Sequence, residues 1–332
     1  IGVNPIIHMV GTTTRLGGTI LHPEARKAMH DASGALVNLD QLNLRAGQII
    51  ADMLEAEAGM VTSGSAGALL LQAAAVIAGQ DPSKISSLPD TDGMNNEIIM
   101  QRSHRMGYDQ CYRAAGAKIV DVGFGNNTED WQIEAAIGEK TVAIAHIVSP
   151  SNGGRGLGFE AVLDIAHRHD VPVIVDAASM LPPRENLFRF VRSGADMVCY
   201  SGGKGIRGPQ GTGILVGKSE LIEAARLNAA PHASVGRPAK VSKEEIMGLL
   251  AALDVFLQGD EEQEIATLKS RCEDLIDHLA EVPGITAKVA HDSYVHITPE
   301  AIVQFELNWA GRSADAILNA LINGDPPIHA KT

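Results

Sequence analysis

The chain contains the glycine-rich stretch YSGGKGIRGPQG, from Tyr200 to Gly211, between two apolar runs. The run before it, Gly194 to Cys199, and the run after it, Thr212 to Gly217, are both typical of buried strands. Glycine lets the backbone approach a ligand closely and places no bulky side chain beside Lys204. The pattern therefore indicates a reacting lysine in a loop between two strands, not a solvated one.

A further apolar run, VPVIVD, begins at Val171 and ends on Asp176. It places a carboxylate at the carboxyl end of a predicted strand, one strand before Lys204. Ordinary roles are open to both residues, because Asp often caps helices and Lys is common in surface loops. The order also resembles the aspartate and the covalently bound lysine of pyridoxal-phosphate (PLP) enzymes with the aspartate aminotransferase fold. There the lysine bonds to the cofactor aldehyde, and the carboxylate keeps the pyridine nitrogen protonated.

Small residues, TSGSAG from Thr62, follow a short predicted strand and open a long helix rich in Ala and Leu. Backbone N–H groups and the helix dipole at such an N-terminus bind phosphate. Ser63 or Ser65 can equally be only the N-cap of that helix. The position of this turn before Asp176 and Lys204 matches the phosphate cup of the PLP fold, and the three motifs together favour that fold.

His104 follows another predicted strand, Glu97 to Gln101. Histidine ordinarily titrates near neutrality and can relay protons, although an isolated histidine is usually structural. The position after the second strand is where the PLP fold places the residue that stacks on the cofactor ring, so we predict stacking. Asn152, after the apolar run Thr141 to Val148, is a candidate to line the same pocket.

Strands alternate with helices through most of the chain, which predicts a mainly parallel sheet covered by helices. Ligands of such sheets bind at the carboxyl ends of the strands. We therefore predict an α/β fold, that of the PLP-dependent transferases of fold type I. The predicted parts are an N-terminal arm at 1–35, a large PLP-binding domain at 36–235 and a smaller α+β C-terminal domain at 236–332. We expect one or both chain ends to be missing and the last domain to be incomplete.

The composition, 45% hydrophobic residues with a net charge of −13, predicts a globular protein. The acidic balance argues against a nucleic-acid partner, because phosphate backbones are bound by clustered Lys and Arg. The apolar runs are too short to span a bilayer and no signal-like segment is evident, so we expect a cytoplasmic protein without a membrane partner. Cys111, Cys199 and Cys272 lack metal-site spacing and no metal is predicted; Cys199 is interpreted as a buried small hydrophobe.

Two segments outside the strands carry candidate ligands for an anionic substrate. The arm offers the hydroxyl of Thr14 and the guanidinium of Arg15, and the joint before the last helices offers Arg237 and Lys240. Arginine grips a carboxylate or phosphate through paired N–H groups, and lysine through a single ammonium. A plain loop and solvated charges are the alternatives.

Five motifs together resemble one family of PLP enzymes, that of selenocysteine synthase (seryl-tRNA selenium transferase) and D-glucosaminate-6-phosphate ammonia-lyase. They are GTTTRLGG from Gly11, TSGSAG from Thr62, DAAS from Asp176, SGGKG from Ser201 with GPQG, and GRPAK from Gly236 with KEE. The likeness covers nearly the whole chain and is weaker for the substrate than for the superfamily. The transferase carries an additional N-terminal tRNA-binding domain, whereas this pattern starts almost at once. A truncated N-terminus keeps the tRNA alternative open.

The resemblance implies a role for each motif. The implied catalytic residues are Lys204, Asp176 and His104. The implied cofactor-binding residues are Ser63, Gly64, Ser65, His104, Asp176, Ser179, Ser201 and Lys204. By the same analogy, Arg237 matches an arginine that contacts anions in the transferase, and Lys240 lies at a second such position.

We therefore expect a PLP-dependent ammonia-lyase that removes water and ammonia from a small hydroxyamino acid, such as D-glucosaminate 6-phosphate, to give a 2-oxo-3-deoxy acid. The same residues suit a selenocysteine synthase-like transferase, an aminotransferase, a racemase or an aldolase. A non-catalytic PLP-fold protein is the rival from a different class. Enzymes of this fold usually place their site at a subunit boundary, so we expect at least a homodimer.

Overall fold

The computed structural model describes residues 2–150, 154–292, 297–306, 309 and 311–331. Contacts divide the chain into two units, one formed by Leu21–Gly259 and the other by Ile1–Ile20 with Asp260–Thr332. In the described ranges, no helix combines the length and apolar character needed to cross a bilayer.

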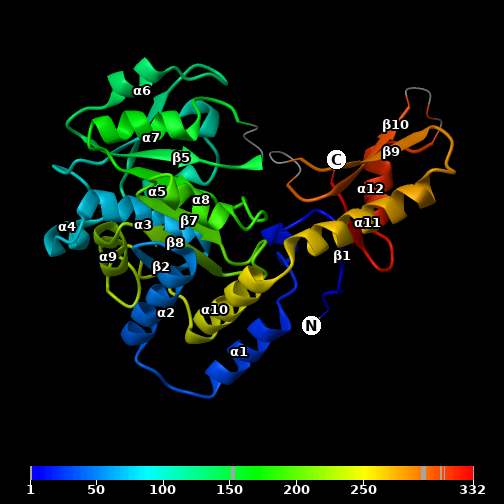
Figure 1. Ribbon diagram of the computed structural model, residues 1–332, viewed down its shortest axis with the longest axis horizontal. Coiled ribbons are helices and arrows are strands. Elements are labelled where there is room, and N and C mark those ends of the chain that lie inside the picture. The colour runs from blue at the N-terminus through cyan, green and yellow to red at the C-terminus, as the bar shows by residue number, and fades with distance from the viewer. Residues whose placement is uncertain (1, 151–153, 293–296, 307–308, 310, 332) are drawn as a thin grey trace. The chain divides into compact units, whose positions relative to one another are not determined.

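The unit of Leu21–Gly259 is built on a seven-stranded sheet with the order β2-β8-β7-β6-β5-β3-β4 (Figure 1). Its strands are β2 (Ala58–Ser63), β3 (Glu97–Gln101), β4 (Lys118–Val122), β5 (Thr141–Ile147), β6 (Val173–Asp176), β7 (Met197–Ser201) and β8 (Thr212–Gly217). Among these strands, β8 runs antiparallel to both of its neighbours, β2 and β7, and all the other neighbouring pairs are parallel. The predicted α/β fold with a mainly parallel sheet is confirmed.

Helices pack on the sheet through two separate apolar clusters. Along β6, Val173 and Val175 enter one cluster and Ile174 the other, because side chains alternate across a strand. The first cluster also receives side chains from α2 (Leu39–Leu54), α6 (Asp130–Ala136), α7 (Phe159–Arg168), α8 (Asn186–Arg192) and α10 (Lys243–Gln258). The second receives side chains from α3 (Gly64–Ala78), α5 (Asp109–Ala114) and α9 (Ser219–Leu227). Burial on both faces explains why β6 is continuously apolar in sequence.

Two helices near the expected domain boundaries belong to this unit. Helix α1 (Pro23–Ser33) packs so closely on α10 that a Cβ at Gly248 would lie 2.6 Å from the side chain of Met29. Helix α10 begins with the predicted capping box, in which Ser242 and Glu245 bond each other's backbone N–H groups. This packing places 21–35 and 236–259 with the sheet, which differs from the boundaries expected at residues 35 and 235. The remaining short helix of the unit is α4 (Pro82–Ser87), and η2 (Arg102–His104) is a 3-10 turn.

The second unit joins segments from both ends of the sequence. Strand β1 (Ile7–His8) pairs in parallel with β11 (Ile328–His329), and β9 (Ile285–Ala290) pairs antiparallel with β10 (Glu300–Phe305). Its helices are η1 (Thr14–Leu16), α11 (Glu261–Leu279) and α12 (Ala314–Ile322).

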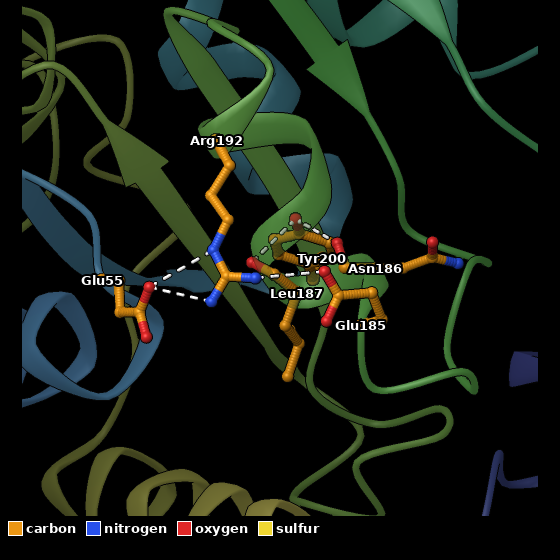
Figure 2. Close-up of polar contacts among 6 residues, drawn as sticks. All are labelled: Glu55, Glu185, Asn186, Leu187, Arg192 and Tyr200. Carbon is orange, nitrogen blue, oxygen red and sulfur yellow. Dashed lines mark hydrogen bonds and ion pairs between the residues drawn. The ribbon is translucent and has the colours of Figure 1, made fainter.

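Helix α8 is tied to the strand that leads to Lys204 (Figure 2). The hydroxyl of Tyr200, on β7, is 2.8 Å from the carbonyl oxygen of Asn186 and 3.3 Å from that of Leu187. Arg192, at the end of α8, bonds Glu55 at 2.8 Å and Glu185 at 3.1 Å. Because Tyr200 is fully buried, its bonds to α8 fix the end of β7 from which the glycine-rich loop departs.

Asp196, directly before β7, is a buried carboxylate that accepts from Val173 N at 2.6 Å and from Lys218 Nζ at 2.5 Å. We expect Asp196→Ala to lower the free energy of unfolding by about 3 kcal/mol, because it leaves a buried N–H and an ammonium without their acceptor. Urea denaturation measures this loss. Glu160→Ala, which breaks an exposed pair with Arg189, should leave the stability nearly unchanged. Similar losses in the two variants would contradict the prediction.

Candidate active site

Two of the predicted phosphate-binding serines lie on either side of one strand. Ser63, the last residue of β2, pairs with Thr212 of β8, and Ser201, the last residue of β7, pairs with Gly213. Because β8 runs antiparallel to both neighbours, the carboxyl ends of β2 and β7 lie at the same edge of the sheet. The structure therefore brings the two serines to one place.

Helix α3 begins at this edge, directly after Ser63. Gly64 has a φ of +65°, which favours glycine, and the Ser63 side chain makes no capping hydrogen bond. The first backbone N–H groups of a helix have no acceptor within the helix. The amides of Gly64 and Ser65, with a serine hydroxyl that is not used as a cap, fit a phosphate group.

Lys204 lies in the loop between β7 and β8, where the backbone passes other segments closely. A Cβ at Gly203 would lie 2.5 Å from Gln210 Cα, and one at Gly205 would lie 2.4 Å from the Leu181 carbonyl oxygen. The glycines around the lysine are therefore required by packing. They allow the tight loop that sets the amine at the carboxyl edge of the sheet.

The Lys204 amine is held and tuned by its surroundings. Its Nζ donates to Ser179 Oγ at 2.9 Å. Burial lowers the pKa of Lys204, while the negative charge of Asp176 acts in the opposite direction. A lowered pKa leaves more of the amine neutral at a given pH, as a nucleophile or base requires.

Asp176, at the end of β6, is 6% exposed. Its Oδ1 accepts from Ala178 N at 3.0 Å and from Cys199 Sγ at 3.7 Å. Burial raises the pKa of Asp176, opposed by the Ala178 N–H, by Lys204 and by Cys199. In the described part of the chain, no hydrogen bond or ion pair uses Oδ2. A buried carboxylate with an oxygen left over fits a protonated pyridine nitrogen, which would supply its positive partner.

His104 is 3% exposed, and both of its ring nitrogens are engaged. Nδ1 accepts from Ile147 N at 3.2 Å, so Nε2 carries the proton and donates to the Arg155 carbonyl oxygen at 3.2 Å. Burial lowers the pKa of His104. These contacts hold the ring neutral and argue against a proton relay. Stacking on a cofactor ring stays a prediction.

Sequence reasoning missed two neighbours of these residues. His146 lies edge-on to His104 with ring centroids 4.6 Å apart. The sequence feature that could have identified it is a histidine inside the apolar run of β5. Cys199 is fully buried, as interpreted from sequence, but its thiol also donates to Asp176. That contact follows from the pairing of Cys199 with Asp176 across two strands.

His146 gives a pH test of the folded state. Burial, and to a lesser degree His104, lower the pKa of His146 from 6.5 to about 3. The unfolded chain therefore takes up this proton first, and stability that is present above pH 6.5 is lost as the pH falls toward 3. The total is on the order of 5 kcal/mol. His146→Leu should lose less stability than the wild type between about pH 7 and about pH 4, by urea denaturation. Equal losses would contradict this.

The predicted anion-binding residues are distributed over both units. Arg237 and Lys240 are exposed, and Ala239 between them lies near the first turn of α3, 3.8 Å from a Cβ placed on Gly67. Thr14 and Arg15 belong to η1 in the other unit. Asn152 lies outside the described residues. In the described ranges, no group of three or more His, Cys, Asp or Glu side chains could hold a metal ion.

Known proteins resemble the chain along most of its length. The family described as SelA: L-seryl-tRNA selenium transferase matches residues 7–282. A 5'-C-glycyluridine monooxygenase-decarboxylase from Streptomyces sp is 31% identical over 100% of this chain and 83% of that protein. A D-glucosaminate-6-phosphate ammonia lyase from Salmonella typhimurium is 30% identical over 100% of this chain and 88% of that protein.

The fold of the whole chain also matches that of a solved structure. The solved structure of a D-glucosaminate-6-phosphate ammonia-lyase superposes with a TM-score of 0.88 at 30% identity, covering 100% of this chain and 88% of that one. The structural neighbours of this chain are PLP-dependent enzymes of fold type I. The predicted fold class is therefore confirmed in this respect as well.

Proposed function

We propose that the chain, which belongs to the L-seryl-tRNA selenium transferase (SelA) family of PLP-fold enzymes, is a PLP-dependent ammonia-lyase. Its substrate would be a small hydroxyamino acid such as D-glucosaminate 6-phosphate, and its products a 2-oxo-3-deoxy acid and ammonia. The observation that carries the proposal is that Lys204 and the buried Asp176 lie at the same edge of the sheet, where the Lys204 amine donates to Ser179. The full-length likeness to an ammonia lyase supports the reaction class.

The residues at this edge would hold the cofactor at three points. The N-terminal turn of α3, with Ser63, and Ser201 across β8 would take the phosphate. Oδ2 of Asp176 would take the protonated pyridine nitrogen, and Lys204 would bond to the aldehyde. When bound, PLP supplies an acceptor for the electron pair left on the substrate's Cα.

Lys204 would act twice in each turnover. Its amine would hold the cofactor aldehyde before substrate binds, and its Nζ would take the proton from the substrate's Cα once the substrate amine occupies that position. The hydrogen bond to Ser179 Oγ uses an N–H of the amine and not its lone pair. Loss of hydroxide from the neighbouring carbon, as water, is followed by hydrolysis to the oxo acid. The water lost is regained at that step, so the net second product is ammonia.

A second candidate reaction follows from the relative at 31% identity, whose name describes oxidation with loss of CO₂. The third is transfer of selenium to a tRNA-bound serine, the reaction for which the family is named. Aminotransferase, racemase and aldolase reactions use the same residues and stay alternatives. A protein that binds the cofactor without turnover is the remaining rival. The first two candidates differ in their products, so one set of assays separates them.

The test begins with the absorption spectrum of the purified protein with added PLP, before and after borohydride. A yellow band that reduction fixes onto Lys204 is expected. D- and L-hydroxyamino acids, with and without phosphate, are then assayed for ammonia, 2-oxo acid, oxygen uptake and CO₂. Ammonia without oxygen uptake supports the lyase, and oxygen uptake with CO₂ supports the second reaction. A band without any of these products excludes the first two reactions and leaves the transferase, the other PLP reactions and the non-catalytic rival, and no band at all refutes PLP binding.

We also propose a homodimer or larger assembly in the cytoplasm, acting on an anionic amino acid. The mass in solution, by light scattering at working concentration, tests the assembly. A monomer would contradict it.

A further inference from the structure

The segment Arg155 to Leu157, between β5 and α7, is held by buried polar side chains at the end of β3. Gln101 is 1% exposed; its Nε2 donates to the Leu157 carbonyl oxygen at 3.0 Å, and its Oε1 accepts from Leu157 N at 2.6 Å. His104 donates from Nε2 to the Arg155 carbonyl oxygen at 3.2 Å. Two side chains therefore fix both ends of a three-residue segment, and we call this arrangement the clamp.

The middle residue of the segment is adapted to the clamp. Gly156 has a φ of +82°, and a Cβ on it would lie 2.3 Å from Gln101 Oε1 and 2.7 Å from Ser103 Oγ. Its N–H donates to the Asn126 carbonyl oxygen at 2.9 Å. A side chain at this position would displace the Gln101 amide. The segment is thus held in one conformation.

The clamp lies next to the proposed cofactor site. Ile147, whose N–H donates to His104 Nδ1, is paired with Asp176 in the sheet. The clamp is therefore one strand away from the carboxylate proposed for the pyridine nitrogen, at the edge where ligands of parallel sheets bind.

The group that this fixed segment carries is the Arg155 guanidinium. The side chain is exposed and makes no ion pair with any described residue, unlike Arg105 and Arg192, which each bond two carboxylates. Guanidinium matches carboxylate and phosphate through paired N–H groups. In a chain of net charge −13, an arginine that has no ion pair among the described residues, on a backbone segment held next to the proposed site, suits an anionic ligand.

We propose that Arg155 recognises an anionic group of the substrate, and that Gln101 and His104 are positioning residues that set its backbone. The inference rests on the proposed function, because it concerns the substrate of that site. The anionic group is either a distal phosphate or the amino acid's own carboxylate. The two sources share the chemistry of recognition and are separated by the choice of ligand.

The test measures the half-saturation concentration of the cofactor absorbance change in the PLP-loaded protein. D-Glucosaminate 6-phosphate and D-glucosaminate are the two probes. Arg155→Ala is expected to raise this concentration at least about tenfold, and Arg155→Lys less, because lysine keeps the charge but not the paired N–H groups. An effect on the phosphorylated probe alone identifies the phosphate as the group bound; an equal effect on both identifies the carboxylate. Lys140→Ala removes an exposed cation at the other end of β5 and should have no effect.

The clamp is tested by Gly156→Ala, which keeps the guanidinium but pushes on Gln101. It should raise KM about as much as Arg155→Ala does, with kcat changed much less and the cofactor band retained. Ser103→Ala is the matched control, because it removes a buried hydroxyl that bonds to none of the described residues and faces the same glycine. Its KM should match the wild type. A Gly156→Ala variant with wild-type KM and an intact cofactor band would refute the positioning role.

Two outcomes separate this inference from the proposed function. If the wild type responds to either probe and Arg155→Ala responds at the same concentrations, the inference is wrong and the proposed function stands. If neither probe alters the wild-type spectrum, the proposed substrate class fails and the inference fails with it.

Discussion

Lys204→Ala is expected to abolish turnover, with a loss of at least about 10⁴-fold, and to leave PLP without a covalent attachment. The variant removes both the amine that would bond the aldehyde and the base that would take the Cα proton. The Asp176 carboxylate and the α3 turn remain, so the cofactor should still bind, more weakly. Borohydride reduction followed by denaturation should keep the cofactor on the wild-type chain and release it from the variant.

Ser179→Ala is the matched control for Lys204. It removes the hydroxyl that accepts from Lys204 Nζ at 2.9 Å and leaves the amine in place. Covalent attachment should persist, with kcat lowered about tenfold through loss of orientation. Measurable turnover in Lys204→Ala within tenfold of the wild type would refute the assigned role of the lysine.

The placement of Lys204 and Asp176 at one sheet edge could be predicted because each is attached to a strand with a strong local signal. Continuous apolar runs end directly at Asp176 and directly before the glycine-rich loop. Parallel strands bring their carboxyl ends to one edge, so no long-range information was needed.

The clamp could not be predicted in the same way. Gln101 and Leu157 are 56 positions apart, and His104 and Arg155 are 51 apart, with two helices and two strands in between. Nothing in the neighbouring sequence distinguishes a glutamine whose side chain bonds a distant loop from one that only ends a strand. The packing of α1 on α10 also joins segments separated by most of the chain, which is why the boundaries of the contact units differ from those expected.

Asp176→Asn is expected to reduce kcat/KM by about 10³-fold while keeping the shape of the site. The amide oxygen can still accept from Ala178 N, as Oδ1 does at 3.0 Å. An uncharged amide cannot hold a proton on a pyridine nitrogen, so the cofactor would lose its electron-accepting form. Asp164→Asn, on the exposed side of α7, is the control and should keep full activity.

Asp176→Asn should lower activity without lowering stability. This difference distinguishes a functional carboxylate from a structural one. Burial raises the pKa of Asp176, so its contribution to stability is present below the pKa of the unfolded chain and is lost as the pH rises through the raised folded value. At neutral pH the cofactor-free Asp176→Asn protein should therefore be at least as stable as the wild type. Urea denaturation from acid to neutral pH, for both proteins without PLP, measures this. If the variant loses stability as well as activity, Asp176 serves the fold, because a structural carboxylate stabilises the native state in its charged form.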